Sequence, residues 1–307
     1  MVAGPMTVLV VGDVVDDIVV RPLTPDAADS DTPSTISACP GGSAANQAAW
    51  LGALGTPVRF AGRAGAANAE EHAAALAACG VDARLAADPG APTGRIVVLA
   101  RGGRRDMYTD RGANLNLVPA DLPDALLDGV GLLHVSGYSL FHPGVAAAVG
   151  DLMRRARERG VDTSVDPASA AFLARTGAAA FRSWARGARL VFPNLDEGRL
   201  LTGEHAPAAV ADALVADHPV VALKLGAGGA LVAARDGTRL RLPSVPAEVV
   251  DPTGAGDAFC AGFLAAWADG RPLDDCARSA LGTAARAVAS VGARPPATAT
   301  EYGSRPA

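Results

Sequence analysis

The chain has 307 residues, half of them hydrophobic and 19% charged, with 27 Lys and Arg against 32 Asp and Glu for a formal net charge of -5. A chain of this length buries about 75% of its unfolded surface, so it needs no disulfide or structural metal, and its apolar content excludes a wholly disordered protein. The mildly acidic balance argues against general DNA or RNA binding, which needs clustered Lys and Arg.

Cysteine spacing and the N-terminal segment bear on the compartment. The four cysteines, at positions 39, 79, 260 and 276, form no C-x-x-C pair. We therefore expect free thiols in a reducing environment rather than a disulfide framework or a zinc site. The apolar N-terminus has no basic segment, and Asp13, Asp16 and Asp17 interrupt it early, so we expect no signal peptide. No uncharged apolar run reaches the ~18 residues of a membrane-spanning helix, and the prediction is a cytoplasmic protein.

Apolar runs and turn residues predict strands and helices that alternate along the chain. Strands are expected at residues 8–11, 58–62, 95–100, 132–135, 163–166, 190–192 and 220–224. Helices are expected at residues 44–54, 69–78, 145–159, 257–267 and 274–290. Gly102-Gly103 indicates one hairpin, and residues 230–234 with 240–242 indicate another. This alternation predicts an α/β fold with a mostly parallel sheet that is covered on both faces.

Two extended segments, residues 14–38 and 91–113, do not follow the alternation, and we expect them to form a small antiparallel flap. No linker-like stretch divides the chain. Residues 1–300 are therefore expected to form a single domain, and residues 301–307 a loose C-terminal tail.

The strongest chemical signal is the string Asp251-Pro252-Thr253-Gly254-Ala255-Gly256-Asp257, placed directly before an apolar helix. Glycines allow the backbone to approach a ligand closely, and the unpaired amides and positive dipole of a helix N-terminus make an anion site. A carboxylate beside such a site would repel a phosphate unless it takes up a proton. Asp257 is therefore either a general base or a simple helix cap, and the spacing alone leaves both open.

The whole string closely resembles the C-terminal signature of the ribokinase/PfkB family of carbohydrate kinases. The resemblance covers about residues 6–296, with Pro252 where the family commonly has Thr. It implies a three-layer α/β/α ribokinase-like sheet domain with a small β-sheet lid. It also implies that the amides of Gly254, Ala255 and Gly256 hold the transferring phosphoryl group, and that Asp257 accepts the proton of the attacking hydroxyl.

Two N-terminal stretches match the acceptor-binding elements of the same family. Pro40-Gly41-Gly42-Ser43 alone would be a structural turn before a helix. The resemblance makes Gly41 and Gly42 a hinge beneath the lid and Asn46 a ligand of sugar hydroxyls. It also assigns Asp17, and secondarily Asp13, to substrate hydroxyls at the base of the lid, where one carboxylate can accept two hydroxyls. Ser43 stands where ribokinases commonly have Lys.

Further stretches match the nucleotide and metal elements of the family. Asn194 and Glu197 match the Asn-x-x-Glu element that holds magnesium-bound water, although the residues alone also fit the start of a helix. Lys224, the single lysine, is either a phosphate ligand or a strand-end charge in solvent. The remaining nucleotide-binding matches are Gly226, Gly228, Gly229 and Thr253. A monovalent cation site maps to Asp251, Thr253, Ser290 and Gly292.

The resemblance predicts a kinase that uses ATP and Mg²⁺ to phosphorylate a primary hydroxyl of a small sugar. K⁺ activation and a homodimer formed through the lid are further expectations, while no nucleic-acid or membrane partner is expected. One alternative is a nucleoside kinase of the same fold, for which Tyr108 or Tyr138 would support the base. An alternative of another class is a non-catalytic sugar or nucleotide sensor, although the intact Asp257 argues against it. His134, inside an apolar strand, is expected to be packed.

Overall fold

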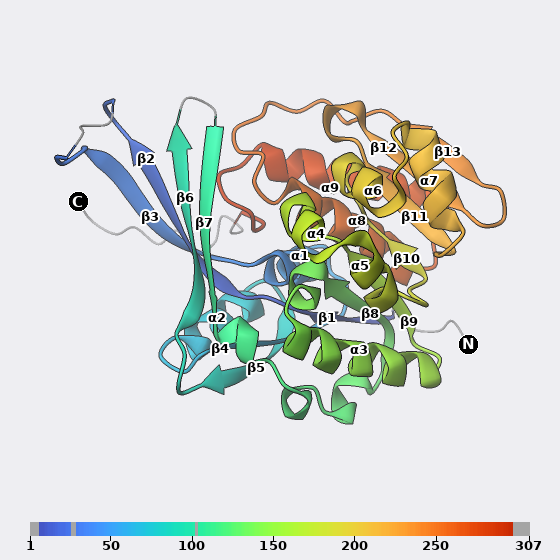
Figure 1. The fold of residues 1–307 in the computed structure, drawn as a ribbon, viewed down its shortest axis with the longest axis horizontal. Coiled ribbons are helices and arrows are strands. Elements are labelled where there is room, and N and C mark those ends of the chain that lie inside the picture. Colours follow the sequence, from blue (N-terminus) through green and yellow to red (C-terminus); the bar gives the residue numbers. More distant parts are fainter. Residues whose placement is uncertain (1–5, 26–28, 102–103, 297–307) are drawn as a thin grey trace.

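A nine-stranded sheet forms the centre of the computed structural model, which describes residues 6–25, 29–101 and 104–296 (Figure 1). In spatial order its strands are β13 (Arg239–Leu242), β12 (Ala230–Ala234), β11 (Val220–Lys224), β10 (Leu190–Val191), β9 (Asp162–Asp166), β8 (Val130–Ser136), β1 (Thr7–Val11), β4 (Val58–Gly65) and β5 (Val81–Asp88). The strands from β11 to β5 run parallel, and β12 and β13 add an antiparallel hairpin.

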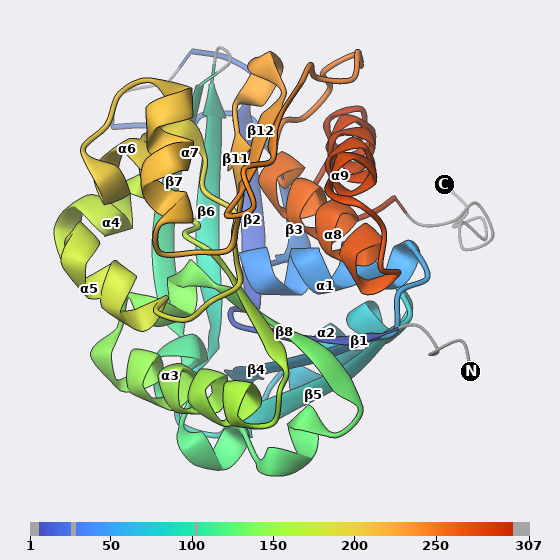
Figure 2. The same cartoon turned by 90° about the vertical axis from the view of Figure 1, so that its right-hand side faces the viewer.

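Helices cover both faces of this sheet because its strands bury apolar side chains on both (Figure 2). In β1, Val8 and Val10 join one hydrophobic cluster, and Leu9 and Val11 join the other. The first cluster includes α1 (Ser43–Ala53), α2 (Ala69–Ala77), α8 (Ala255–Ala268) and α9 (Leu273–Val288). The second includes α3 (Pro143–Glu158), α4 (Ala170–Thr176), α5 (Ala178–Trp184), α6 (Leu195–Thr202) and α7 (Pro207–Val215). Short 3-10 turns are η1 (Ala113–Asn116), η2 (Pro119–Asp121), η3 (Asp124–Leu127), η4 (Gly137–Leu140) and η5 (Gly226–Gly228). The predicted three-layer arrangement is thus confirmed.

A second, four-stranded sheet projects from the main body beside α1 and α2 (Figure 1). Its strands, in spatial order, are β3 (Ser34–Gly41), β2 (Val15–Pro22), β6 (Thr93–Arg101) and β7 (Arg104–Gly112). The expectation of a purely antiparallel flap is wrong, because β2 and β6 pair in parallel while the two outer pairs are antiparallel. Asn114 anchors this sheet to the exit of β1: its Oδ1 accepts from the Val14 amide at 3.0 Å, and its Nδ2 donates to the Val14 carbonyl at 2.9 Å.

The remaining predictions from the sequence concern a turn, a hairpin, the C-terminal tail, the cysteines and membrane-spanning helices. Pro40 and Gly41, predicted as part of a turn, end the edge strand β3, and an edge strand is where a sheet tolerates proline. The predicted hairpin residues Gly102-Gly103 and the predicted tail at 301–307 lie outside the described residues. All four cysteines are free thiols. No helix among the described residues combines the length and the apolar character required to span a bilayer.

Candidate active site

Charged and polar side chains gather where the parallel strands of the main sheet end. Asp13 follows β1, Asp166 ends β9, Asn194 follows β10 and Lys224 ends β11. Open α/β sheets bind their ligands outside these carboxyl ends. The N-terminus of α8 packs at the same edge, where it brings Asp257 to these residues.

Asp257 is the third residue of α8, and its carboxylate faces helix α1. Its Oδ1 accepts from Ser43 Oγ at 2.7 Å and from Gln47 Nε2 at 3.2 Å, and its Oδ2 accepts from Asn46 Nδ2 at 3.2 Å. Burial raises the pKa of Asp257 to about 7, against the opposing effect of these hydrogen bonds. The alternative that Asp257 caps its helix is wrong, because the N-cap is Gly254 and no side chain caps the helix. A carboxylate that titrates near neutral pH is suited to proton transfer.

The first turn of α8 borders a cavity, and its Ala255 amide makes a long hydrogen bond of 3.4 Å to the Pro252 carbonyl. Gly254, Ala255 and Gly256 form its first turn, and the amides of a first turn have no acceptor within the helix. A cavity of about 440 Å³ opens beside Ala255 and Gly256. Its other walls are formed by the glycine loop after β11 and by mostly apolar side chains, namely Gly226, Ala227, Gly229, Ser244, Val245, Pro246, Ala247, Val249, Pro252, Phe259, Leu281, Ala284, Ala285 and Val288. An anion at the helix end with an apolar group further along would fit this space.

Lys224 lines this cavity, and Asn194 lies next to it, because the two residues pair in parallel as an isolated bridge. Asn194 caps α6 by accepting from the Glu197 amide at 2.9 Å, and Glu197 Oε2 accepts from the Asn194 amide at 2.8 Å. The predicted helix start is therefore confirmed as a capping box. Burial raises the pKa of Glu197 to about 7. Lys224 is not a solvated charge, because its ammonium contacts both Asp166 oxygens, at 3.0 and 3.1 Å.

On the other side of Asp257, residues from the lid base and α1 surround a second polar region. The Asp17 carboxylate lies over Gly41, where a β-carbon would come within 2.1 Å of its Oδ2. Burial and the neighbouring Asp13 raise the pKa of Asp17 to about 6. Arg294 enters from the loop after α9 and makes long hydrogen bonds of 3.4 Å to Asn46 Oδ1 and to the Gly41 carbonyl. Among the described residues, its Nη1 has no hydrogen-bond partner.

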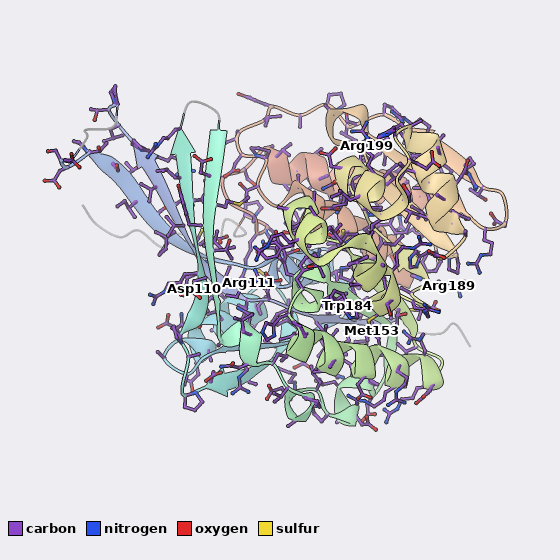
Figure 3. All side chains as sticks on the ribbon, viewed as in Figure 1. Asp110, Arg111, Met153, Trp184, Arg189 and Arg199 are labelled. Atoms are coloured by element: carbon purple, nitrogen blue, oxygen red, sulfur yellow. The ribbon has the colours of Figure 1, made fainter. Side chains whose placement is uncertain are left out.

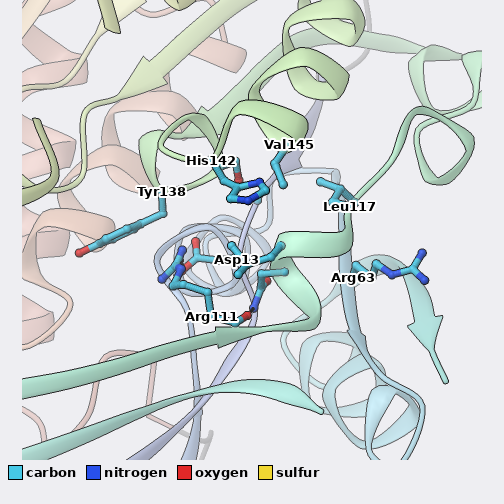
Figure 4. A pocket seen from close by; sticks show the side chains of 11 residues that line it. Asp13, Arg63, Arg111, Leu117, Tyr138, His142 and Val145 are labelled. Carbon is cyan, nitrogen blue, oxygen red and sulfur yellow. Dashed lines mark hydrogen bonds and ion pairs between the residues drawn. The ribbon is translucent and has the colours of Figure 1, made fainter. Parts of the chain in front are cut away.

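Asp13 holds the start of α1 in place. It is buried, and its two oxygens accept from the amides of Ser43 and Ala44, which follow the N-cap Gly42. Arg111 turns from β7 toward the main body and approaches Asp13 Oδ2 at 3.4 Å (Figure 3). Its guanidinium also lies 4.6 Å from the centre of the Tyr138 ring, so that the three side chains border one small cavity (Figure 4). Asp13 therefore fixes the start of α1 at the site, and its predicted contact with substrate hydroxyls stays a prediction.

The residues expected to bind a monovalent cation lie on two adjacent loops. Asp251 Oδ1 accepts from the Thr253 amide at 2.8 Å, and Oδ2 accepts from the Gly292 amide at 3.2 Å. The Ser290 hydroxyl donates instead to the Ala287 carbonyl at 3.2 Å. Monovalent cation binding stays a prediction.

A model described as pfkB family carbohydrate kinase matches residues 6–300. The chain belongs to the PfkB family of carbohydrate kinases. This kinase is 31% identical to 1-phosphofructokinase from Rhodobacter capsulatus, over 91% of this chain and 88% of that protein. It is 28% identical to Bifunctional protein HldE from Bradyrhizobium diazoefficiens over 93% of this chain, and the match spans 60% of that longer relative. Adenosine kinase from Sinorhizobium meliloti matches in structure with a TM-score of 0.84 and 26% identity, covering 95% of this chain and 96% of that one.

Four residues of the candidate site were not predicted from the sequence as contributors. Gln47, Asp166 and Cys260 form a buried group beneath Asp257, and Arg294 reaches Asn46. Asp166 was open to prediction from the sequence, because it ends a predicted strand. The carboxyl ends of the parallel strands form the edge of the sheet where the other site residues lie. Gln47 and Cys260 stand next to recognised motifs but look like ordinary helix residues. No sequence signal distinguishes Arg294.

Proposed function

We propose that this kinase transfers the γ-phosphoryl group of ATP to a primary hydroxyl of a small sugar or sugar-like acceptor, with Asp257 as the general base. One observation carries the proposal: the Asp257 carboxylate, with a pKa near neutrality, directly follows the two α8 residues that line the 440 Å³ cavity and accepts a hydrogen bond from Asn46 on the acceptor side. Donor and acceptor would therefore meet at this carboxylate.

In the proposed reaction Asp257 accepts the hydroxyl proton while the acceptor oxygen bonds to phosphorus and the bond to the leaving ADP breaks. The amides of Gly254, Ala255 and Gly256 face the charge that develops on the transferred group, and fixed dipoles of this kind stabilise it without reorganisation. Ser43 and Asn46 hold the carboxylate in position. Asp17 binds the other acceptor hydroxyls from the lid side.

The residues beside Lys224 fit a magnesium nucleotide. Glu197 is a buried carboxylate beside Asn194, and hydrated Mg²⁺ is held in proteins by carboxylates together with substrate phosphates. Bound there, Mg²⁺ would neutralise phosphate charge. The glycine loop at Gly226, Gly228 and Gly229 would lie along the nucleotide, and Thr253 would lie near its phosphates.

A coupled ADP-release assay across pentoses, hexoses, sugar phosphates, keto-acid sugars and nucleosides tests this function. We expect one acceptor class to stimulate ADP release well above the rate with ATP alone. Absence of phosphoryl transfer to every member of the panel would contradict the proposal.

A nucleoside kinase is the second candidate, favoured by the likeness to an adenosine kinase structure. Its aromatic support would be Tyr138, because Tyr108 is 63% exposed on the outer part of the lid. The Tyr138 ring is covered by Arg111 on one face and packs edge-on against Phe141 and Phe172. A nucleoside base would have to displace Arg111, so Arg111→Ala should favour nucleosides over sugars in the same panel if this candidate holds.

The titration of Asp257 predicts a pH dependence. With a pKa raised to about 7 by burial, the base is protonated below that pH, and kcat/KM for the acceptor should fall about tenfold per pH unit there and level off above it. The same shift makes the stability contribution of this carboxyl decline as pH rises from 3.8 toward 7. A profile that stays flat from pH 5.5 to 8 would contradict the assignment.

The role of Asp17 predicts a selective effect on acceptor binding. Asp17→Asn should raise KM for the acceptor about tenfold or more, because a charge-assisted hydrogen bond to a hydroxyl is lost, while KM for ATP changes little. Asp106→Asn, at an exposed position of the lid strand β7, is the matched control and should leave both values unchanged. An Asp17→Asn variant with an unchanged acceptor KM would remove Asp17 from the acceptor site.

Exposed apolar side chains of the lid sheet are relevant to the oligomeric state of the protein. Ile36, Met107 and Tyr108 of the lid sheet are each more than 60% exposed. These apolar side chains support the proposal of a homodimer formed through the lid, which sedimentation of the wild-type protein against an Ile36→Glu variant would test.

A further inference from the structure

A buried ion pair lies close to the proposed base, with Gln47 in contact with both. Lys224 Nζ contacts Asp166 Oδ1 at 3.0 Å and Oδ2 at 3.1 Å, and the Asp166 side chain is only 3% exposed. Lys224 Nζ also lies under the first turn of α8, 3.7 Å from where a β-carbon on Gly256 would be. Removing an ion pair from water costs free energy of desolvation. Stabilisation of the fold alone therefore does not account for a buried pair at this position.

Gln47 connects this pair to the base. Its Nε2 donates to Asp166 Oδ2 and to Asp257 Oδ1, at 3.2 Å each. Its Oε1 lies 3.0 Å from His134 Nε2, while His134 Nδ1 lies 2.8 Å from Ser164 Oγ. Burial lowers the pKa of His134 to about 4, so the ring is neutral. Because Gln47 Oε1 can only accept, Nε2 carries the proton and Nδ1 accepts from the Ser164 hydroxyl. This arrangement fixes the Gln47 amide with its N–H groups toward both carboxylates.

Cys260 completes the surroundings of Asp166. Burial raises the pKa of this thiol well above its ordinary value, so it remains an S–H donor, and its Sγ lies 3.3 Å from Asp166 Oδ2. Asp166 Oδ2 thus receives contacts from three side chains that come from three different elements, β11, α1 and α8. The group sets the position of α1 relative to α8 at the point where both helices hold the base.

We propose that Lys224 and Asp166 are positioning residues, which orient the Gln47 amide and through it hold the Asp257 carboxylate toward the acceptor hydroxyl. The inference rests on the proposed function of Asp257 as the base. In this proposal Lys224 acts on the base. The sequence had instead indicated a contact with the phosphates of the nucleotide as one of two possible roles.

The two charges act on Asp257 in opposite directions. The Asp166 carboxylate raises the pKa of Asp257 and the Lys224 ammonium lowers it, both less strongly than burial does. Burial alone would lower the pKa of Lys224, but the neighbouring acidic groups, Asp166 first among them, together outweigh burial and keep the ammonium charged. The polar and titratable groups that face Asp257 are Ser43, Asn46 and Gln47 of α1, Asp166 of β9, Lys224 of β11, Cys260 of α8 and Tyr138 of η4. Among them Asp166 and Lys224 are the charged pair, so removal of either should shift the titration of the base with a known sign.

The test compares Lys224→Met, Asp166→Asn and the double variant with the wild-type protein. The pKa of Asp257 is measured without substrates, from the ¹³C carboxyl resonance that Asp257→Asn removes. Lys224→Met should raise this pKa by about one unit, Asp166→Asn should lower it by about one unit, and the double variant should return near the wild-type value. With the best acceptor of the panel, each single variant should lose about tenfold or more in kcat while KM for ATP stays within about twofold, because a misplaced base affects the chemical step.

Asp162→Asn is the matched control, since Asp162 begins the same strand and forms an exposed pair with Arg189 at the opposite edge. It should change neither the pKa nor kcat, and thermal melts identify any variant that fails to fold. An Asp257 resonance that titrates identically in wild type and in folded single variants would overturn the inference, as would a loss expressed in KM for ATP with kcat retained. Because the resonance needs no turnover, a kinase inactive on the whole panel would contradict the proposed function without hiding this result.

Discussion

Replacing Asp257 with Asn should reduce kcat by about 10²- to 10⁴-fold, the usual contribution of a positioned general base. Asn has nearly the same shape and can still accept from Ser43, but it cannot take up the proton of an attacking hydroxyl. The amides of Gly254, Ala255 and Gly256 are untouched, so KM for ATP should stay within about twofold of wild type. Steady-state kinetics with the best acceptor measure both values.

Asp269→Asn is the matched control for this substitution. Asp269 lies just after the other end of α8, and within the described part of the chain its side chain forms only an exposed contact with Arg271, so its replacement should leave kcat unchanged. A thermal melt of Asp257→Asn should lie close to that of wild type, because the neutral amide also removes the cost of a desolvated charge. If the variant keeps more than a tenth of the wild-type kcat, another group accepts the proton and Asp257 is not the base.

Much of the fold was accessible from the sequence because its central strands are continuous apolar runs. β1, β8 and β11 are buried on both faces, and such strands are easily recognised. β5 was missed because it is an edge strand with a half-exposed, mixed pattern from Val81 to Asp88. The helices α4 and α5 were missed because Gly177 separates two seven-residue segments that are too short for a clear period.

The site was predictable to the extent that its residues belong to contiguous strings. Asp257 with its glycines and Asn46 with Gly41 could be read directly from the chain, and the structure brings these two strings together. The pairing of Lys224 with Asp166 joins residues 58 positions apart, and Gln47 joins Asp166 across 119 positions. Contacts of that separation depend on the strand order of the sheet, which the local pattern of residues does not contain.

The loop after α9 should prove as important to catalysis as the α8 turn that it supports. Trp50 of α1 donates to the Ala293 carbonyl at 2.9 Å and so fixes this loop against the site. Gly254 has φ 76°, and a β-carbon there would lie 2.6 Å from Ala293 Cα and 2.7 Å from its carbonyl oxygen. Alanine at this position would therefore face both an unfavourable backbone conformation, at about 1–2 kcal/mol, and a clash with backbone atoms that cannot rotate away.

Gly254→Ala should consequently lower kcat/KM about 10²-fold or more, because the clash moves the amides that face the transferred group and the helix turn that carries Asp257. Gly270→Ala separates the effect of the backbone conformation from the effect of the clash. Gly270 has φ 72° just beyond the other end of α8, and nothing lies within 4 Å of its β-carbon position. That variant should lose a similar amount of thermal stability, from the unfavourable backbone conformation alone, and keep its activity. Equal kcat/KM for the two variants, at equal loss of melting temperature, would show that the contact between Gly254 and Ala293 has no part in the geometry of the site.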